Sequence, residues 1–112
     1  MEFGLFSNGE RGRQIARDTF EEDLEEVVYA DELGMEEAWI SEHGTFLSWE
    51  KPDTLPCADL FICKAAALTK NIRMGPGIRP LPFFHPVQVA TDVAVCDQMM
   101  RRRLRSSMAA WS

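Results

Sequence analysis

No stretch of this 112-residue sequence is long and apolar enough to cross a membrane. A transmembrane helix needs about 20 consecutive apolar residues, and every apolar run here is much shorter. The first residues, Met1 to Gly4, also lack the basic and apolar segments of a secretory signal. We therefore expect a cytoplasmic protein with no membrane partner.

Cysteine is scarce as well, with three residues at Cys57, Cys63 and Cys96. Their number is odd and their spacing matches no metal-ligand motif, so no metal site is predicted. All three fall in segments with helical patterns, where a free cysteine usually packs as a small apolar side chain. Cys57 stands at the start of its predicted helix, where a thiol can be mildly activated. Buried, inert thiols are the favoured interpretation.

Basic residues are outnumbered, because the chain has 12 Lys and Arg against 18 Asp and Glu, with a net charge of −6. The imbalance is larger before residue 100, since the last twelve positions hold four arginines and no acid. Binding to a nucleic-acid backbone needs a basic surface. The acidic body therefore argues against nucleic acid as a partner.

Apolar runs and helical patterns alternate along the chain, and 46% of the residues are hydrophobic, enough for one domain with one core. Residues 3–6 form a short apolar run typical of a buried strand. Thr19 and Glu22 form a capping box, which predicts that a helix begins there and ends at Gly34. The acidic residues at positions 21–26 are expected to form a solvated helix surface.

The pattern of a strand followed by a helix recurs twice more. Strands are predicted at residues 38–40 and from residue 72, and helices at residues 57–69 and 87–99. Between the last strand and the last helix, a cluster of prolines and glycines excludes a regular ladder and indicates a specially shaped loop. His85, directly before Pro86, is interpreted as a loop or capping residue.

Three strand–helix units with a period of about 35 residues predict an α/β fold with a parallel sheet, either doubly wound or closed as a barrel. Eight such units would need about 280 residues, close to the size of a (β/α)8 barrel. In both architectures the loops at the carboxyl ends of the strands face the ligand crevice. Glu42 and His43, just after the strand at 38–40, are therefore candidate site residues.

Over residues 1–99 the chain resembles the bacterial-luciferase-like flavin-dependent monooxygenases. The resemblance is carried by the order and spacing of six short motifs. They are residues 3–6, Ala30-Asp31-Glu32-Leu33-Gly34, Trp39-Ile40-Ser41-Glu42-His43, residues 72–77, His85-Pro86 and Asp97-Gln98-Met99.

The resemblance implies a fold and a chemistry. The family has a (β/α)8 TIM-type barrel, so this chain would be its first three βα units, truncated. Family members bind reduced FMN, or in some relatives a deazaflavin, and the flavin-using members oxygenate a small-molecule substrate with O2. We therefore expect a flavin-dependent oxidoreductase, namely an FMNH2- and O2-using monooxygenase. The alternatives are a deazaflavin-dependent hydride-transfer oxidoreductase and a non-catalytic truncated fragment. Partners to test are a flavin reductase and a second copy of the chain in a homo-oligomer.

The resemblance also assigns roles to the residues after the second strand. His43 corresponds to the catalytic histidine of the family, as a general base or a hydrogen-bonding group at the flavin, and Glu42 to the acid beside it. Gly44 stands where family members often carry a second histidine. Taken from the residues alone, His43 is either functional or structural. Glu42 either orients the imidazole or pairs elsewhere, because adjacent strand residues point to opposite faces.

A second set of site residues follows the third strand. The Gly77–Ile78 bond matches the position where the family commonly has a cis peptide bond behind the flavin ring. The resemblance therefore implies that Pro76, Gly77 and Ile78 bind the cofactor. The alternative is a simple irregular strand end.

The end of the chain departs from the resemblance. After Met99, family members continue with a small-residue turn, an arginine and a fourth strand, whereas residues 100–112 here are rich in arginine. We expect residues 1–99 to be the barrel segment and residues 100–112 to be a divergent tail translated out of frame. Resequencing of the locus would test this expectation.

Overall fold

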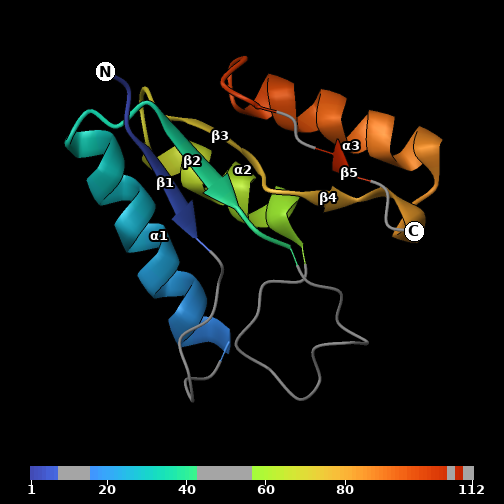
Figure 1. The fold of residues 1–112 in the computed structure, drawn as a ribbon, viewed down its shortest axis with the longest axis horizontal. Coiled ribbons are helices and arrows are strands. Elements are labelled where there is room, and N and C mark those ends of the chain that lie inside the picture. The colour runs from blue at the N-terminus through green and yellow to red at the C-terminus, as the bar shows by residue number, and fades with distance from the viewer. Residues whose placement is uncertain (8–15, 43–56, 106–107, 110–112) are drawn as a thin grey trace.

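The computed structural model describes residues 1–7, 16–42, 57–105 and 108–109. Its elements in chain order (Figure 1) are β1 (Gly4–Ser7), α1 (Ala16–Glu32), β2 (Glu37–Ile40), α2 (Ala58–Leu68), β3 (Arg73–Pro76), β4 (Arg79–Pro80), the 3-10 helix η1 (Leu81–Phe83), α3 (Pro86–Met99) and β5 (Met108–Ala109). Every predicted strand and helix is present, and apart from the start of α1 the bounds agree to within about one residue.

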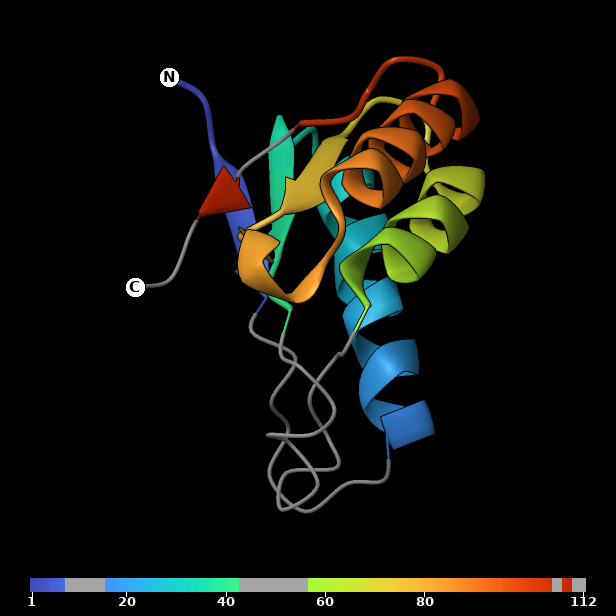
Figure 2. The ribbon, with the colours of Figure 1, turned by 90° about the vertical axis from the view of Figure 1, so that its right-hand side faces the viewer.

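The strands β1, β2 and β3 form one parallel sheet in that order. The register places Ser7 opposite Ile40 and Ile40 opposite Pro76, so the three strands end together. We call this end the carboxyl edge of the sheet and the opposite end the amino edge. Figure 2 shows α1, α2 and α3 on one side of the sheet. The prediction of a parallel α/β fold built from three βα units is confirmed.

The hydrophobic core lies between the sheet and the helices. Ala38 and Ile40 of β2 face this core and are buried, whereas Glu37 and Trp39 alternate with them and face the other side. Within the described part of the chain, no helix is long and apolar enough to span a bilayer. The other buried core side chains are Leu24, Val27, Ala30, Ala58, Phe61, Ile62, Ala65, Ala66, Ile72, Met74 and Met100.

Helix α1 begins earlier than predicted. It starts at Ala16, so Thr19 lies inside the helix and the predicted capping box is wrong. Thr19, Asp23, Val27 and Ala30 recur at spacings of three and four residues, and all four are buried on one face. Thr19 therefore belongs to the buried stripe, and Asp23, at 2% exposure, is not part of a solvated acidic surface.

The end of α1 follows the prediction. Gly34 has a φ of +80°, a left-handed conformation that glycine adopts without steric cost. The N–H of Met35 donates to the carbonyl of Ala30 at 3.0 Å, and the N–H of Gly34 donates to the carbonyl of Asp31 at 3.1 Å. These bonds satisfy carbonyls at the end of the helix and turn the chain into β2.

The carboxylate of Asp31 binds backbone N–H groups at the amino edge of the sheet. Its two oxygens accept backbone N–H groups from Lys70, Asn71 and Ile72 at 2.9, 2.9 and 2.8 Å. Three donors of the segment that leads into β3 are thereby satisfied by one side chain of α1. This contact ties the first βα unit to the third strand.

The chain after α3 joins the sheet beside β3. The N–H of Met74 donates to the carbonyl of Arg103 at 3.1 Å, and the N–H of Arg105 donates to the carbonyl of Met74 at 2.7 Å. Leu104 forms a parallel bridge with Met74. Gly75 permits this approach, because a β-carbon at that position would collide with the carbonyl oxygen of Arg105.

The guanidinium of Arg103 also binds groups at the amino edge of the sheet. It donates to the carbonyls of Ala66 at 2.9 Å and Ile72 at 3.2 Å and to the hydroxyl of Thr69 at 3.1 Å. The side chain thus binds groups at the end of α2 and before β3. Residues 103–105 pair with β3, and the out-of-frame origin of residues 100–112 stays a prediction.

Candidate functional site

Backbone hydrogen bonds fix the chain just beyond the strands at the carboxyl edge. The N–H of Ser41 donates to the carbonyl of Ser7 at 2.9 Å, and the N–H of Gly77 donates to the carbonyl of Ile40 at 2.7 Å. Each loop therefore leaves the sheet from a position held by the neighbouring strand. The backbone of the first residue in each loop is therefore fixed relative to the sheet.

The peptide bond between Gly77 and Ile78 is cis, as the resemblance predicted. Gly77 lies against two aromatic side chains, because a β-carbon built on it would stand 3.3 Å from Cε2 of Phe6 and 3.3 Å from Cβ of Trp39. Phe6 is 62% exposed and follows Leu5, which packs against the core, so its ring lies on the face of the sheet away from the core. The segment after β3 therefore borders an open aromatic surface.

Glu42 lies at the carboxyl edge, half-buried, but its observed contact is with a helix. One carboxylate oxygen accepts the N–H of Ala58, the first residue of α2, at 2.9 Å. The other oxygen, Oε2, is buried without a hydrogen-bond partner in the described structure. Burial raises the pKa of Glu42, and the bond from Ala58 and the charge of Arg79 offset this only in part. The fold therefore favours the protonated acid relative to an exposed glutamate.

His43 and Gly44 lie outside the described residues, so the geometry of the imidazole is not part of the site described here. Glu42 was predicted either to orient the imidazole or to pair elsewhere. Its hydrogen bond in the described structure is the one from Ala58 at the start of α2. The catalytic roles of His43 and Glu42 stay predictions.

A buried arginine joins the segment after β3 to helix α2 and was missed by sequence reasoning. Arg79 follows the cis bond, is 2% exposed and forms an ion pair with Asp59 in the first turn of α2. Its guanidinium carbon lies 5.1 Å from the centroid of the Phe84 ring. Its Nε has no hydrogen-bond partner within the described structure. We call Glu42, Asp59 and Arg79 the charged cluster. The one feature of the sequence that could have pointed to Arg79 is its place in an otherwise apolar, proline-rich loop.

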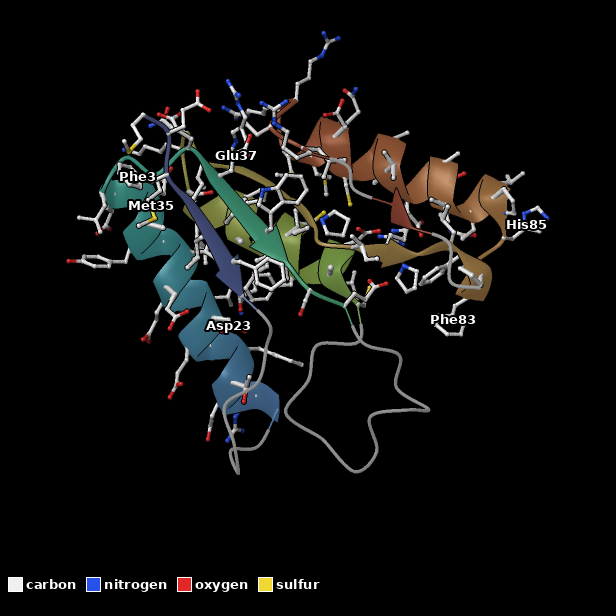
Figure 3. The ribbon with its side chains drawn as sticks, in the orientation of Figure 1. Phe3, Asp23, Met35, Glu37, Phe83 and His85 are labelled. Atoms are coloured by element: carbon white, nitrogen blue, oxygen red, sulfur yellow. The ribbon has the colours of Figure 1, made fainter. Side chains whose placement is uncertain are left out.

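The remaining candidates lie away from the cluster. Nδ1 of His85 accepts the N–H of Val87 at 3.2 Å, so its interpretation as a capping residue is confirmed. Figure 3 shows His85 and Phe83 beside the start of α3, while Glu37 lies at the amino end of β2. There Glu37 accepts the indole N–H of Trp39 at 3.2 Å and pairs with Arg105 at 3.2 Å.

Comparison with known proteins relates this geometry to a family. The family model described as luciferase-like monooxygenase matches residues 1–111. The match therefore extends beyond Met99, where the resemblance read from the sequence ended. A curated relative, the 3,6-diketocamphane 1,6-monooxygenase of Pseudomonas putida, is 36% identical over 104 residues, which are 92% of this chain and 26% of the relative. The chain spans about a quarter of the length of the curated relatives it matches.

Solved structures give the same result. The oxygenating constituent of the 3,6-diketocamphane monooxygenase of Pseudomonas putida, in complex with FMN, matches all of this chain and 30% of its own, with a TM-score of 0.87 and 34% identity. A coenzyme F420 dependent tetrahydromethanopterin reductase from Methanopyrus kandleri matches 96% of this chain and 26% of its own, with a TM-score of 0.67 and 23% identity. The second likeness concerns the fold alone.

Proposed function

Because this chain belongs to the luciferase-like monooxygenase family, we propose that it supplies the first three βα units of a flavin-dependent monooxygenase that uses reduced FMN and O2. One observation carries the proposal: the structure that matches the whole chain at 34% identity is an oxygenating constituent with FMN bound. The carboxyl edge of the sheet is where parallel barrels place their reaction centres.

The residues after β3 fit a flat cofactor ring. Gly77 offers backbone without a side chain, and Phe6 provides an exposed aromatic surface beside it. Pro76, Gly77 and Ile78 would hold the ring of reduced FMN along this segment. When bound, reduced FMN supplies the electrons that activate O2, while the protein supplies position and proton control.

The residues after β2 would control protons and loop position. His43 would hold or move a proton at the reacting centre, since an imidazole titrates near neutral pH. Glu42 would act on the same loop by holding the start of α2 through Ala58. Its raised pKa means that this carboxyl keeps its proton to a higher pH than an exposed glutamate does.

Partners follow from the chemistry of the relatives. The matched structure is an oxygenating constituent, which supports a separate flavin reductase as the source of reduced FMN. The substrate would be a small organic molecule together with O2. A homo-oligomer and a cytoplasmic location belong to the same proposal.

The second candidate is hydride transfer with a deazaflavin. Coenzyme F420 is a deazaflavin, and the reductase that uses it shares the fold at 23% identity. The match to the FMN-binding structure is closer in both identity and TM-score, so FMN is the favoured cofactor. The third candidate is a fragment that binds neither.

Anaerobic titration of the purified chain with reduced FMN tests the proposal. Saturable binding is expected, and Gly77→Val should weaken it about tenfold, because the added side chain would press on Phe6 and Trp39 and displace the segment. Gly4→Ala is the matched control, since its β-carbon would meet Glu37 at an ordinary 3.4 Å. Tighter binding of a deazaflavin would support hydride transfer, and no saturable binding of either would support the fragment.

A further inference from the structure

Two thiols face each other between α2 and α3. The Sγ atoms of Cys63 and Cys96 lie 3.5 Å apart, and both cysteines are free. We propose that Cys63 and Cys96 form a redox-active dithiol site, which a peroxide oxidises to a reversible disulfide between α2 and α3. This goes beyond the monooxygenase proposal, since it concerns the helix layer and not the carboxyl edge.

The geometry favours this pair. Helices α2 and α3 lie side by side on the same face of the sheet (Figure 2), and the two cysteines are 33 residues apart in the chain. A disulfide needs the two sulfur atoms to approach by only about 1.5 Å from their present separation.

A small oxidant can reach the pair. Cys63 and Cys96 line a cavity of about 310 Å3 together with Cys57, Asp59 and Arg79. Cys63 is half-buried, whereas Cys96 is 4% exposed. The accessible sulfur at this cavity is therefore that of Cys63 or of Cys57.

The buried partner is not the thiol that reacts first. Burial, followed by the hydrogen bond with Cys63 and the charge of Asp59, raises the pKa of Cys96 to about 12. Cys96 therefore remains a thiol at neutral pH and is a poor first nucleophile. Cys63, with greater access, is the thiol that meets the oxidant first.

The reaction balances with hydrogen peroxide as oxidant. The sulfur of Cys63 attacks one peroxide oxygen, the O–O bond breaks, and the other oxygen leaves as water after taking the thiol proton. The sulfur of Cys96 then attacks the sulfenic sulfur of Cys63, the S–O bond breaks, and that oxygen leaves as water with the proton of Cys96. Two thiols lose two electrons, and one peroxide becomes two waters.

The disulfide would also reach the charged cluster. Cys63 lies on the same helix as Ala58 and Asp59, which bind Glu42 and Arg79. Fixing α2 against α3 would fix the start of α2 as well. The redox state of the dithiol would then affect the positions of Glu42 and Arg79 at the carboxyl edge.

Peptide mapping of the purified chain tests the proposal. The reduced chain is treated with hydrogen peroxide, its remaining thiols are alkylated, and the digest is examined by mass spectrometry. We expect the Cys63–Cys96 disulfide to exceed any pair with Cys57 by about tenfold, and dithiothreitol to reverse it. A sample in guanidinium should give mixed pairs. Mixed pairs in the native buffer, or over-oxidation without a disulfide, would overturn the proposal.

A variant outside the pair keeps the test decisive. Cys57→Ser should still form the disulfide, whereas Cys63→Ser and Cys96→Ser should not. Oxidation should raise the Tm of the Cys57→Ser chain by roughly 10 °C, because the new bond closes a long loop in the unfolded state. Failure of Cys57→Ser to form the bond, or an unchanged Tm after the bond has formed, would contradict a dithiol site built by the fold.

Discussion

Two carboxylates, Asp31 and Glu42, bind backbone N–H groups at opposite edges of the same sheet, and their surroundings differ. Asp31 at the amino edge accepts three N–H groups from the segment that leads into β3. Glu42 at the carboxyl edge accepts one, from Ala58, and its second oxygen is buried without a partner in the described structure. Among the described residues, the first carboxylate accepts three backbone N–H groups and the second accepts one.

The pKa values follow this difference. Burial acts to raise the pKa of Asp31, but the three backbone donors and the charge of Arg103 outweigh it, so the pKa is lowered. Burial also raises the pKa of Glu42, and there the single donor and Arg79 do not compensate. Glu42 is also more deeply buried than Asp31, so the depth of burial and the number of donors together set the opposite directions of the two pKa shifts. Folding therefore favours the ionised form of Asp31 at the amino edge and disfavours the ionised form of Glu42 at the carboxyl edge, each relative to an exposed carboxyl.

The largest effect is expected from breaking the ion pair of the carboxyl edge. Asp59→Ala would leave Arg79 buried without its partner, and the free energy of unfolding should fall by about 3–5 kcal/mol. Guanidinium denaturation measures this loss. The double variant Asp59→Ala/Arg79→Met removes both charges and should recover most of it. Equal losses in the single and double variants would show that the charge pairing is not the cause.

The next effect concerns the amino edge. Asp31→Ala removes the acceptor of three N–H groups and should cost about 2–4 kcal/mol near neutral pH. Because the pKa of Asp31 is lowered on folding, this stabilisation is present above its ordinary value of 3.8 and is lost as the pH falls through the folded value.

Urea denaturation over a series of pH values checks this prediction. The stabilities of the wild type and Asp31→Ala should converge in acid. Glu32→Ala, an exposed neighbour, should stay within about 0.5 kcal/mol of the wild type throughout. A gap between the wild type and Asp31→Ala that is independent of pH would contradict the role of the charge.

The smallest effect has the opposite sign of pH dependence. The pKa of Glu42 is raised on folding, so its protonated form stabilises the fold below the ordinary value of 4.5, and this stability is lost as the pH rises through the folded value. Glu42→Gln keeps an acceptor for Ala58 and cannot ionise. The variant should therefore gain on the wild type with rising pH, by about 1 kcal/mol or less.

The same denaturation series measures this gain, with Glu42→Ala as its control. Glu42→Ala lacks the acceptor and should be less stable than Glu42→Gln at every pH. If Glu42→Gln instead lost stability with rising pH, then the ionised carboxylate would be the favoured form and the comparison between the two edges would fail.

Local patterns were enough to predict the layers of the fold. Apolar runs located the strands, and Gly34 and His85-Pro86 marked the end of α1 and the start of α3 through their own backbone chemistry. The predicted start of α1 was wrong because Thr19 and Asp23 are polar residues on the buried face of this helix. A pattern that counts apolar residues does not reveal such a stripe.

The charged cluster was beyond local reasoning for another reason. Asp59 and Arg79 belong to different βα units, and Glu42 reaches Ala58 across 16 positions. These contacts exist only when the loops meet at the carboxyl edge. The cis bond at Gly77–Ile78 was predictable only through family resemblance, since glycine next to isoleucine has no such tendency of its own.

Gly75 has a consequence for how the sheet can grow. The segment after α3 brings the carbonyl of Arg105 against a bare backbone, and Leu104 then forms its bridge with Met74 and packs against the core. A shift of one residue would turn an arginine toward that core. The position of this segment therefore depends on the lack of a side chain at Gly75, and even a single methyl group there would collide with Arg105 and separate the segment from β3.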